Sequence, residues 1–481
     1  MGHPLSRTVL SAGLFALSTA TFGCGSDGSP GASGTGQEQQ PDGVSWNGQI
    51  APIVSKKCTG CHHTGGIAPM SLETYATAKV YAGRMLAEVQ AGLMPPWGAR
   101  NTDECTPSFA FKDDPRLTDD ETALMQAWVE AGAPQGAPST KPLPKPIKNE
   151  LTDADLHLTI PTTIDVAGSD DRMLCFSLDP GVDEEKWINA VQVTPGNAEI
   201  VHHVLLFADP DGQSEALAGS QNYYDCFGGP QLDNVVLLGA WAPGGVPMVT
   251  PPDVALDLSA HSRIVMQVHY HPHAAVKSTV DSSTSVDLRF ASDIPKYPGR
   301  LELIGNLSQG DMKKAGGKGY GLMSDPDDKD PKTPAFVIPA NAAAHTESMR
   351  VLIPPAAAAS EYRLWGVATH MHYVGTDMKI DVTHADDGSD ECLLQTPQWD
   401  FNWQRVYYYD AALDSLPVIR PGDVLNLRCT YDNTMDNAFV REALAQQGYE
   451  SPVEVPLGET TLDEMCLGAF GVAMVGNGRA Q

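Results

Sequence analysis

The spacing of apolar residues changes near residue 150. Before it, between about residues 44 and 137, apolar positions follow the helical period over three stretches, at 50–54, 71–91 and 118–132. After it, apolar and polar residues alternate over short segments separated by turn residues, as in half-buried strands. These segments lie at 200–207, 263–269, 285–290, 349–353, 362–370, 378–382 and 424–430. The pattern predicts a multidomain chain, with a small all-α domain followed by two all-β domains of the jelly-roll or β-sandwich type.

The third helical stretch carries signals at both of its ends. Thr118 and Glu121 have the spacing of a capping box, in which each side chain satisfies a backbone N–H of the first turn. Leu124 and Trp128 then share one face, and Gly132 is placed to end the helix. The capping box therefore predicts a helix that begins at Thr118.

Changes in composition divide the chain into six segments. The expected boundaries are 1–24 for an export signal, 25–43 for a flexible linker, 44–137 for the α domain, 138–150 for a spacer, 151–294 for the first β domain and 295–481 for the second. The spacer has proline at positions 138, 142, 144 and 146. Because successive prolines favour polyproline II, it should be a semi-rigid connection.

The N-terminus has the features of an export signal: a positive charge, an apolar run over residues 9–17, and small residues up to Cys24. Cys24 stands where a lipid-modified cysteine would. Thr21 and Phe22 fit a lipoprotein cleavage site poorly, so ordinary cleavage after Ala20 is the alternative. Either outcome predicts an extracytoplasmic protein that is periplasmic, anchored to the outer membrane or secreted.

Composition narrows the range of partners. A chain of 481 residues with 42% hydrophobic residues can bury substantial cores. Its formal charge of −29 makes nucleic acid or an anionic membrane surface an unfavourable partner, because like charges repel. We therefore expect no nucleic acid, and membrane contact only through a lipid at Cys24. A small molecule or another redox protein fits the charge.

The α domain carries a CxxCH sequence at Cys58, Cys61 and His62. In this motif two thiols attach c-type haem covalently, and the histidine becomes an axial iron ligand. The simpler alternative is a pair of thiols in a turn. The helices around the motif resemble those of a small class I cytochrome c, which favours haem.

The second axial ligand of the haem is expected to be Met94. It lies in a Pro-rich loop between the second and third helices, where such cytochromes often place an axial methionine. Met70 and His63 are competing ligands, and Met94 could instead be a packed core residue. A Met/His ligand pair would raise the potential of the haem.

The β domains contain two groups of residues that bind soft or borderline metals. The members are His202, His203, His269, His370, His372 and Met465. Residues two apart on a strand share a face, so His370 and His372 can hold one ion together. The adjacent residues His202 and His203 could share an ion through a bulge or through different ring nitrogens. Pro272 is expected to end its strand, which makes His271 and His273 loop residues.

Four motifs around these ligands resemble, in the same order, the copper motifs of the type II, ascorbate-dependent copper monooxygenases, which include peptidylglycine α-hydroxylating and dopamine β-monooxygenases. They are Val201–Phe207, Gln267–Tyr270, the His370-x-His372 pair and Asp463–Cys466. The resemblance extends over roughly residues 155 to 475, and four ordered motifs are far more specific than one. It implies that the two β domains are the N-terminal and the C-terminal copper monooxygenase domain of that family.

The resemblance also implies a role for each ligand. His202, His203 and His269 would bind a copper that stores and passes an electron, and Gln267 matches a position near it. His370, His372 and Met465 would form the catalytic copper site, where dioxygen is activated and a substrate C–H bond is attacked. The thioether of Met465 fits this role because sulfur stabilises Cu(I). A zinc ion would be better served by a third histidine or a thiolate.

Two disulfides follow from the same resemblance. Cys175 and Cys226 match a pair in the first copper domain, and Cys429 and Cys466 match a pair that braces the strand carrying Met465. Cys105 and Cys392 remain, and an exported chain favours their pairing over free thiols. We therefore hypothesise a bridge between the haem domain and the second copper domain.

One departure from the family concerns the substrate. Ala368, Leu467 and Ala469 replace the Arg, Asn and Tyr that hold the substrate carboxylate in the peptide-hydroxylating member. Without that clamp a C-terminal glycine peptide is an unlikely substrate, and a less polar small organic molecule is favoured.

The expected function is that of an exported dicopper monooxygenase that uses O2, with electrons from an external donor passing through the fused haem to the first copper. A tethered haem raises the local concentration of electron donor. The alternatives are a haem that serves a separate partner, a copper and haem electron-transfer or copper-binding protein without hydroxylase activity, and a zinc hydrolase.

Overall fold

The computed structural model describes residues 43–476 except 65, 67, 147–149, 169–170, 244, 273–275, 277, 307–319, 327–328, 330–331, 333 and 356–358. The predicted export signal, the lipid site at Cys24, nearly all of the linker, and His273 therefore lie outside the described residues. Within those residues, no helix combines the length and the apolar character that a membrane crossing requires.

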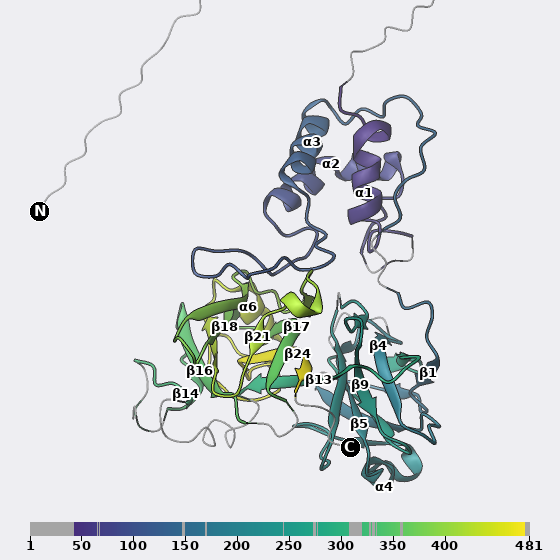
Figure 1. Cartoon of the computed structure of the whole chain (residues 1–481). Coiled ribbons are helices and arrows are strands. Elements are labelled where there is room, and N and C mark those ends of the chain that lie inside the picture. Colours follow the sequence, from purple (N-terminus) through teal and green to yellow (C-terminus); the bar gives the residue numbers. More distant parts are fainter. Residues whose placement is uncertain are drawn as a thin grey trace, which may run out of the picture. The chain divides into compact units, whose positions relative to one another are not determined.

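The α domain consists of short helices around a small core of its own (Figure 1). A π-helical turn, η1 (Trp46–Ile50), runs into α1 (Ala51–Lys57), and α2 (Tyr75–Gln90) and α3 (Asp119–Glu130) follow. The predicted capping box is present, since the Thr118 hydroxyl accepts from the backbone N–H of Glu121 and the Glu121 carboxylate accepts from that of Thr118. Buried Trp128 and Ile50 pack together in this core. The three helical stretches expected from the sequence are thus confirmed.

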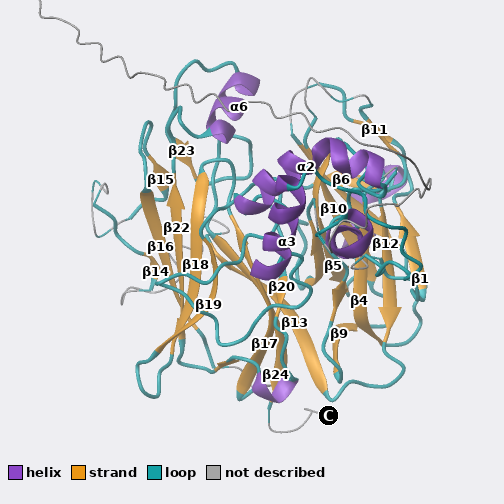
Figure 2. Ribbon diagram, turned by 90° about the horizontal axis from the view of Figure 1, so that it is seen from above, coloured by secondary structure: helices purple, strands orange, loops and turns teal. Residues whose placement is uncertain are grey.

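The rest of the chain is almost entirely β structure, as the alternating pattern predicted. A ten-stranded sheet runs through both β domains (Figure 2). Its strands are, in spatial order, β1 (Leu156–Thr159), β12 (Ser285–Phe290), β4 (Lys186–Thr194), β9 (Val254–Leu258), β13 (Tyr297–Gly305), β24 (Leu467–Val475), β17 (Glu361–His370) and β20 (Tyr407–Tyr408), with β8 (Met248–Val249) beside β4 and β21 (Val418–Ile419) beside β17. Strand β13 joins the domains, because it pairs in parallel with β9 and antiparallel with β24.

Each β domain has a second sheet of five strands. In the first domain the order is β6 (Tyr223–Asp225), β3 (Arg172–Leu178), β10 (Arg263–Tyr270), β5 (Val201–Asp209) and β7 (Val236–Trp241). In the second it is β14 (Gly321–Leu322), β16 (His345–Leu352), β22 (Val424–Tyr431), β18 (Gly375–Thr383) and β19 (Asp390–Thr396). The main hydrophobic core draws on strands of both domains.

The remaining elements are short. Two two-stranded ribbons are formed by β2 (Ile164–Asp165) with β11 (Val280–Asp281), and by β15 (Val337–Ile338) with β23 (Val455–Pro456). The helices are α4 (Gln213–Ala218), the 3-10 turns η2 (Gly219–Gln221) and η3 (Leu413–Ser415), and α6 (Ala438–Gln447). None of these contributes a metal-binding residue expected from the sequence.

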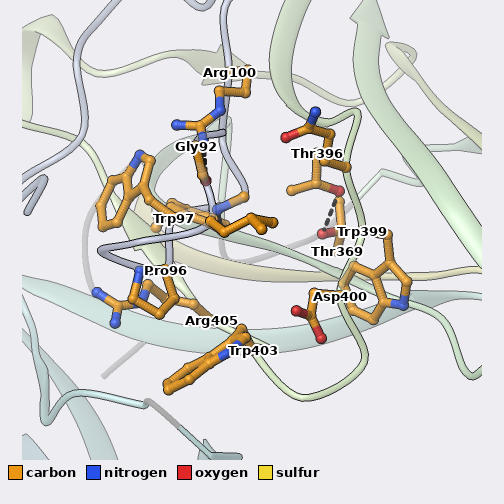
Figure 3. A pocket seen from close by; sticks show the side chains of 14 residues that line it. Gly92, Pro96, Trp97, Arg100, Thr369, Thr396, Trp399, Asp400, Trp403 and Arg405 are labelled. Atoms are coloured by element: carbon orange, nitrogen blue, oxygen red, sulfur yellow. Dashed lines mark hydrogen bonds between the residues drawn. The ribbon is translucent and has the colours of Figure 1, made fainter. Parts of the chain in front are cut away.

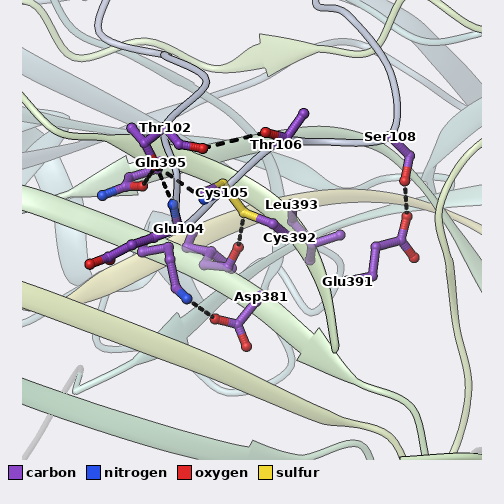
Figure 4. Close-up of a disulfide and its surroundings, with 12 residues drawn as sticks. Thr102, Glu104, Cys105, Thr106, Ser108, Asp381, Glu391, Cys392, Leu393 and Gln395 are labelled. Atoms are coloured by element: carbon purple, nitrogen blue, oxygen red, sulfur yellow. Dashed lines mark hydrogen bonds and ion pairs between the residues drawn. A yellow bond between two sulfur atoms is a disulfide. The ribbon is translucent and has the colours of Figure 1, made fainter. Parts of the chain in front are cut away.

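The segment from residue 97 to 112, which connects α2 to α3, packs against the second β domain. Buried Trp97 belongs to the main β core, and its ring meets that of Tyr407 edge-on, with centroids 5.0 Å apart. Phe111 forms a β-bridge with Tyr409. Cys105 forms a disulfide with Cys392 of β19 (Figure 4). The hypothesised disulfide between the α domain and the second β domain is therefore present.

Candidate metal centre

The first histidine group forms where β5 and β10 pair. His269 lies opposite His203, but the next residue, Tyr270, lies opposite Val201, so the register shifts by one residue. His202 is the additional residue of this β-bulge, and a bulge re-aims side chains that would otherwise point to opposite faces. Adjacent residues of a regular strand point to opposite faces, and the bulge allows His202 and His203 to face the same site.

The three side chains of this group converge on one point. Nδ1 of His203 lies 3.1 Å from Nδ1 of His202 and 3.3 Å from Nδ1 of His269. A tetrahedral ion with metal–nitrogen bonds of about 2.0 Å would space its ligand nitrogens by about 3.3 Å. Desolvation, together with the neighbouring histidines, holds the pKa of both His202 and His203 well below its usual range. The imidazoles are therefore neutral, the form that binds a metal.

A carboxylate and a fourth histidine support this group, and sequence reasoning missed both. Asp171 Oδ1 lies 2.5 Å from Nδ1 of His271 and 3.6 Å from Nε2 of His269. Burial alone would raise the pKa of Asp171, but its hydrogen bonds to the two histidines and their charge outweigh burial and hold it far below the usual range. Asp171 also accepts a hydrogen bond from the Thr461 hydroxyl at 3.1 Å. The carboxylate thus connects the histidines of the first domain to the segment that leads to Met465.

The position of His271 differs in part from the expectation. Strand β10 ends at Tyr270, so Pro272 does mark the end of a strand. Yet the His271 side chain is only 14% exposed and faces the site, with its Nε2 3.4 Å from the Tyr373 hydroxyl. The alternation of histidines at 269 and 271 was the signal that could have indicated this residue.

The second histidine group lies at the end of β17. The rings of His370 and His372 have centroids 5.2 Å apart. Nδ1 of His370 lies 2.7 Å from the side-chain oxygen of Gln404, and Nδ1 of His372 lies 3.0 Å from the carbonyl oxygen of Asp463. Because both partners are acceptors, both Nδ1 atoms donate and each Nε2 is left with a lone pair. Hydrogen bonds of this kind orient the histidine ligands of metal sites.

Met465 is held beside this pair through its backbone. The buried Glu464 carboxylate accepts hydrogen bonds from the backbone N–H of His372 and, at 2.8 Å, from that of Met465. Burial raises the pKa of Glu464 to about 8 against the effect of these hydrogen bonds. The Tyr431 hydroxyl donates to the Met465 carbonyl at 2.9 Å, and the next residue, Cys466, forms a disulfide with Cys429. Three interactions therefore hold the backbone at Met465: the hydrogen bond of its N–H to Glu464, that of its carbonyl to Tyr431, and the disulfide of the next residue.

The two histidine groups face one another across a single pocket. The ring centroids of His203 and His370 are 6.4 Å apart. Phe401 stacks on His202 at 4.4 Å and packs against Tyr373 at 4.1 Å. The pocket is lined by Asp171, His202, His203, His269, His271, His372, Tyr373, Phe401 and residues 459–461. The sequence predicted two groups, and the structure brings them together.

Both disulfides expected from the resemblance are present. In addition to the bond between Cys429 and Cys466, Cys175 on β3 is bonded to Cys226. Gln267, on β10, donates to the carbonyl of Cys226 at 3.0 Å, so it supports this disulfide rather than the histidines. All described cysteines are paired in this way except Cys58 and Cys61.

The CxxCH sequence has the donor set that c-type haem requires. Cys58 and Cys61 are both free thiols, and burial raises the pKa of Cys58 to about 12. Nδ1 of His62 lies 3.1 Å from the carbonyl oxygen of Met70, which makes Nδ1 the donor and leaves Nε2 with a lone pair. Two unpaired thiols beside an oriented histidine therefore fit covalent haem.

The candidate axial residues differ in position. Met70 packs against the core of the α domain, and its carbonyl occupies the Nδ1 side of the His62 ring. Met94 is half-buried on the loop after α2. His63 is exposed.

A second, larger pocket lies between this loop and the second β domain (Figure 3). Trp97, Trp399, Trp403 and Tyr407 give it an aromatic lining. The Arg405 guanidinium lies 5.3 Å from the centre of the Trp97 ring. It is also near enough to Cys61 to lower the pKa of that thiol, although burial raises that pKa overall. Arg405 follows Gln404, the partner of His370, so these two neighbouring residues interact with the CxxCH sequence through charge and with the second histidine group through a hydrogen bond.

Comparisons with known proteins agree with part of this picture. No protein-family model matches the chain. The chain is 28% identical over 127 residues to peptidyl-glycine alpha-amidating monooxygenase B of Xenopus laevis, and 29% identical over 123 residues to form A. The aligned parts cover 26% and 25% of this chain but only 14% and 12% of the two relatives. A structure of PNGF-II is similar over 68% of this chain and 66% of its own, at 9% identity and a TM-score of 0.28, which is too low to relate the folds. The chain is thus similar, over about a quarter of its length, to peptidylglycine monooxygenases.

Proposed function

We propose that the protein is an exported dicopper monooxygenase that hydroxylates a C–H bond of a small organic molecule with O2. The single observation that carries this proposal is that two differently built histidine groups lie side by side. The ring centroids of His203 and His370 are 6.4 Å apart, and His372 lines the same pocket as the first group. The similarity to peptidylglycine monooxygenases supports the same reaction type. Three disulfides are typical of proteins outside the cytosol.

The histidines would hold the two copper ions. His202, His203 and His269 would bind the first through the three Nδ1 atoms that converge at the bulge. His370 and His372 would bind the second through Nε2, with the thioether of Met465 as the third ligand. Copper in these sites would supply one-electron transfer and the activation of dioxygen. Unequal donor sets suit unequal roles, because a thioether favours Cu(I) and three imidazoles accept both oxidation states.

The residues around the ligands fix their orientation and exclude water. Gln404 and the Asp463 carbonyl keep Nδ1 of each second-group histidine protonated. Asp171 holds His271 and lies beside His269. Phe401 covers His202 and, with Tyr373, forms the apolar wall of the pocket. A preorganised site of this kind loses little free energy to rearrangement during the reaction.

The substrate is proposed to be less polar than a peptide carboxylate. Ala368 lies opposite Ala469, and His370 lies opposite Leu467, on the paired strands β17 and β24. Three positions that could carry a carboxylate clamp are therefore apolar and adjacent to the second histidine group. Without a cation there, a carboxylate brought into the pocket would lose hydration without compensation.

Electrons are proposed to come from an external donor through a haem bound to Cys58, Cys61 and His62, with Met94 as the second axial ligand. The expected acceptor is the three-histidine copper. The second copper is an alternative acceptor, because Gln404, the partner of His370, is the chain neighbour of Arg405, whose charge lowers the pKa of Cys61. Stopped-flow mixing of reduced haem protein with bound Cu(II) should show the haem becoming oxidised, and freeze-quench EPR would identify the copper reduced first. Haem that stays reduced would contradict this supply.

Metal analysis separates the proposed function from its alternatives. The oxygenase requires two type 2 Cu(II) signals per chain by EPR, and oxygen uptake that depends on an organic substrate. Two coppers without substrate-dependent uptake would indicate an electron-transfer protein. Zinc in the purified protein, with no copper signal, would indicate a hydrolase.

A further inference from the structure

A second type of ligand cluster lies in the C-terminal β domain, apart from the two histidine groups. Asp325, His345 and Glu347 each present a ligand atom, and these three atoms lie within 4.8 Å of one another. His345 and Glu347 are two residues apart on β16, so their side chains share a face of the strand. Strand β16 lies between β14 and β22 in the five-stranded sheet of this domain (Figure 2).

The carboxylate of Glu347 is buried and only half satisfied. Its residue is 0% exposed. Oε1 accepts from the backbone N–H of Val337 at 3.3 Å and lies 3.1 Å from Nε2 of His345. Oε2 is buried and has no hydrogen-bond partner among the described residues. An ionised oxygen in that position is costly unless a positive charge or a proton compensates it.

The neighbouring carboxylate makes this arrangement less favourable still. Burial raises the pKa of Glu347, and the nearby charge of Asp325 raises it further. One imidazole, that of His345, lies close to both carboxyl groups. Two carboxylates and one imidazole that converge in this way are a common donor set for a divalent cation.

We infer that Asp325, His345 and Glu347 form a third metal site, which takes a divalent ion of the zinc class. An imidazole nitrogen favours zinc over calcium or magnesium, and Asp and Glu oxygens are ordinary zinc ligands. A water molecule would complete four-coordination. The donor set contains no thioether and only one histidine, so it differs from both copper groups.

The location indicates a structural role for this ion. On the paired strands β16 and β22, Glu347 lies opposite Cys429 and His345 lies opposite Tyr431. Cys429 is bonded to Cys466, and the Tyr431 hydroxyl donates to the carbonyl of Met465. An ion bound to β16 would therefore stabilise the part of β22 that holds Met465. The site does not depend on the proposed oxygenase activity.

Zinc binding to the full-length chain tests this inference. Metal-free protein is dialysed against Zn²⁺, the bound zinc is counted by mass spectrometry, and its affinity is measured by competition with a chromophoric chelator. The variants are Glu347→Gln, which keeps the shape of the side chain, and Asp325→Asn at a half-buried position. We expect each variant to lose one zinc equivalent, or to bind that equivalent at least about 100-fold more weakly than wild type.

His384→Gln is the matched control. His384 lies 3.3 Å from Glu391 and 3.4 Å from Asp423, so it is also a histidine between two carboxylates of the same domain. This variant should keep the zinc equivalent. Zinc held by the copper ligands is counted separately with His202→Ala and His370→Ala, which should leave the Glu347-dependent equivalent unchanged.

Equal zinc stoichiometry and affinity in wild type, Glu347→Gln and Asp325→Asn would overturn the inference, and Glu347 would then be a buried carboxyl group that keeps its proton. If Glu347→Gln fails to fold, Asp325→Asn decides the question alone. Failure of the copper sites to bind copper would leave this result unaffected, so the two proposals are tested independently.

Discussion

Nδ1 of His370 lies 2.7 Å from the side-chain oxygen of Gln404. This hydrogen bond leaves Nε2 of His370 available to a metal, and Gln404 is covalently joined to Arg405, which lies near Cys61. Gln404 therefore orients a histidine of the second group, and the charge of its neighbour Arg405 acts on a thiol of the CxxCH sequence.

Replacing Gln404 with leucine should weaken copper at the second group. Without the acceptor, His370 can rotate or adopt the other tautomer, and loss of such a partner typically costs 10–100-fold in metal affinity. Copper titration followed by EPR measures the effect, which should be confined to one of two copper signals. Gln398→Leu is the control, because Gln398 lines the neighbouring aromatic pocket without contacting His370. Equal losses in both variants would contradict an orienting role.

Replacing both Cys105 and Cys392 with serine should loosen the attachment of the segment 97–112 to the second β domain. The disulfide closes a loop of 287 residues, and removal of a native disulfide typically costs about 2–5 kcal/mol. Urea unfolding followed by tryptophan fluorescence, which includes Trp97, measures the change. A non-reducing peptide map of wild type in which both thiols are free would contradict the bridge.

Replacing Met94 with alanine should lower the reduction potential of the haem. A methionine ligand opposite histidine raises the potential, and its loss removes that effect. Met70→Ala is the comparison, since the Met70 carbonyl contacts the Nδ1 side of His62. A redox titration of the haem absorbance should shift for Met94→Ala and stay near wild type for Met70→Ala. The opposite result would assign the axial position to Met70.

Replacing Glu121 with glutamine should destabilise the α domain at neutral pH. Burial would raise the pKa of Glu121, but the hydrogen bond from Lys57, 2.8 Å away, and those from Thr118 outweigh burial and lower it. A carboxyl pKa that is lower in the folded state stabilises the fold at a pH above the unfolded-state pKa of 4.5. This stabilisation is lost as the pH falls from 4.5 through the lowered pKa of the folded state. The variant should therefore be less stable by about 0.2–1 kcal/mol at pH 7, and its stability should approach that of wild type as the pH falls below the lowered pKa. Thermal melts across this range measure the difference, and a constant difference would contradict the ion pair as its cause.

Local sequence signals predicted the helices and strands, whereas the division of the histidines into two groups rested on the resemblance to a family. The capping box at Thr118 and the alternation of strand residues depend on neighbours only a few positions apart. The pair His370 and His372 was predicted from the period of a strand. Strand β17 ends at His370, however, so His372 lies two residues beyond it and the strand period does not place its side chain.

The features that the sequence did not predict depend on contacts between distant segments. The bulge at His202 arises from the register of β5 against β10, and Asp171 reaches the site from the end of another strand. Trp97 was assigned to the α domain by its position, yet it packs in the β core. No local pattern encodes these pairings, because the partner lies 60 or more residues away in each case.

The most direct test of the central claim is a search for an oxygenated product. The wild-type protein and Met465→Ala, both loaded with copper, are incubated with reductant and a mixture of small apolar organic molecules under ¹⁸O2, and the products are analysed by mass spectrometry. The proposed function predicts a product that gains one ¹⁸O atom with wild type and is absent, or at least about 100-fold less abundant, with Met465→Ala. Wild-type protein that binds two coppers and accepts electrons, but transfers no ¹⁸O to any molecule, would contradict it.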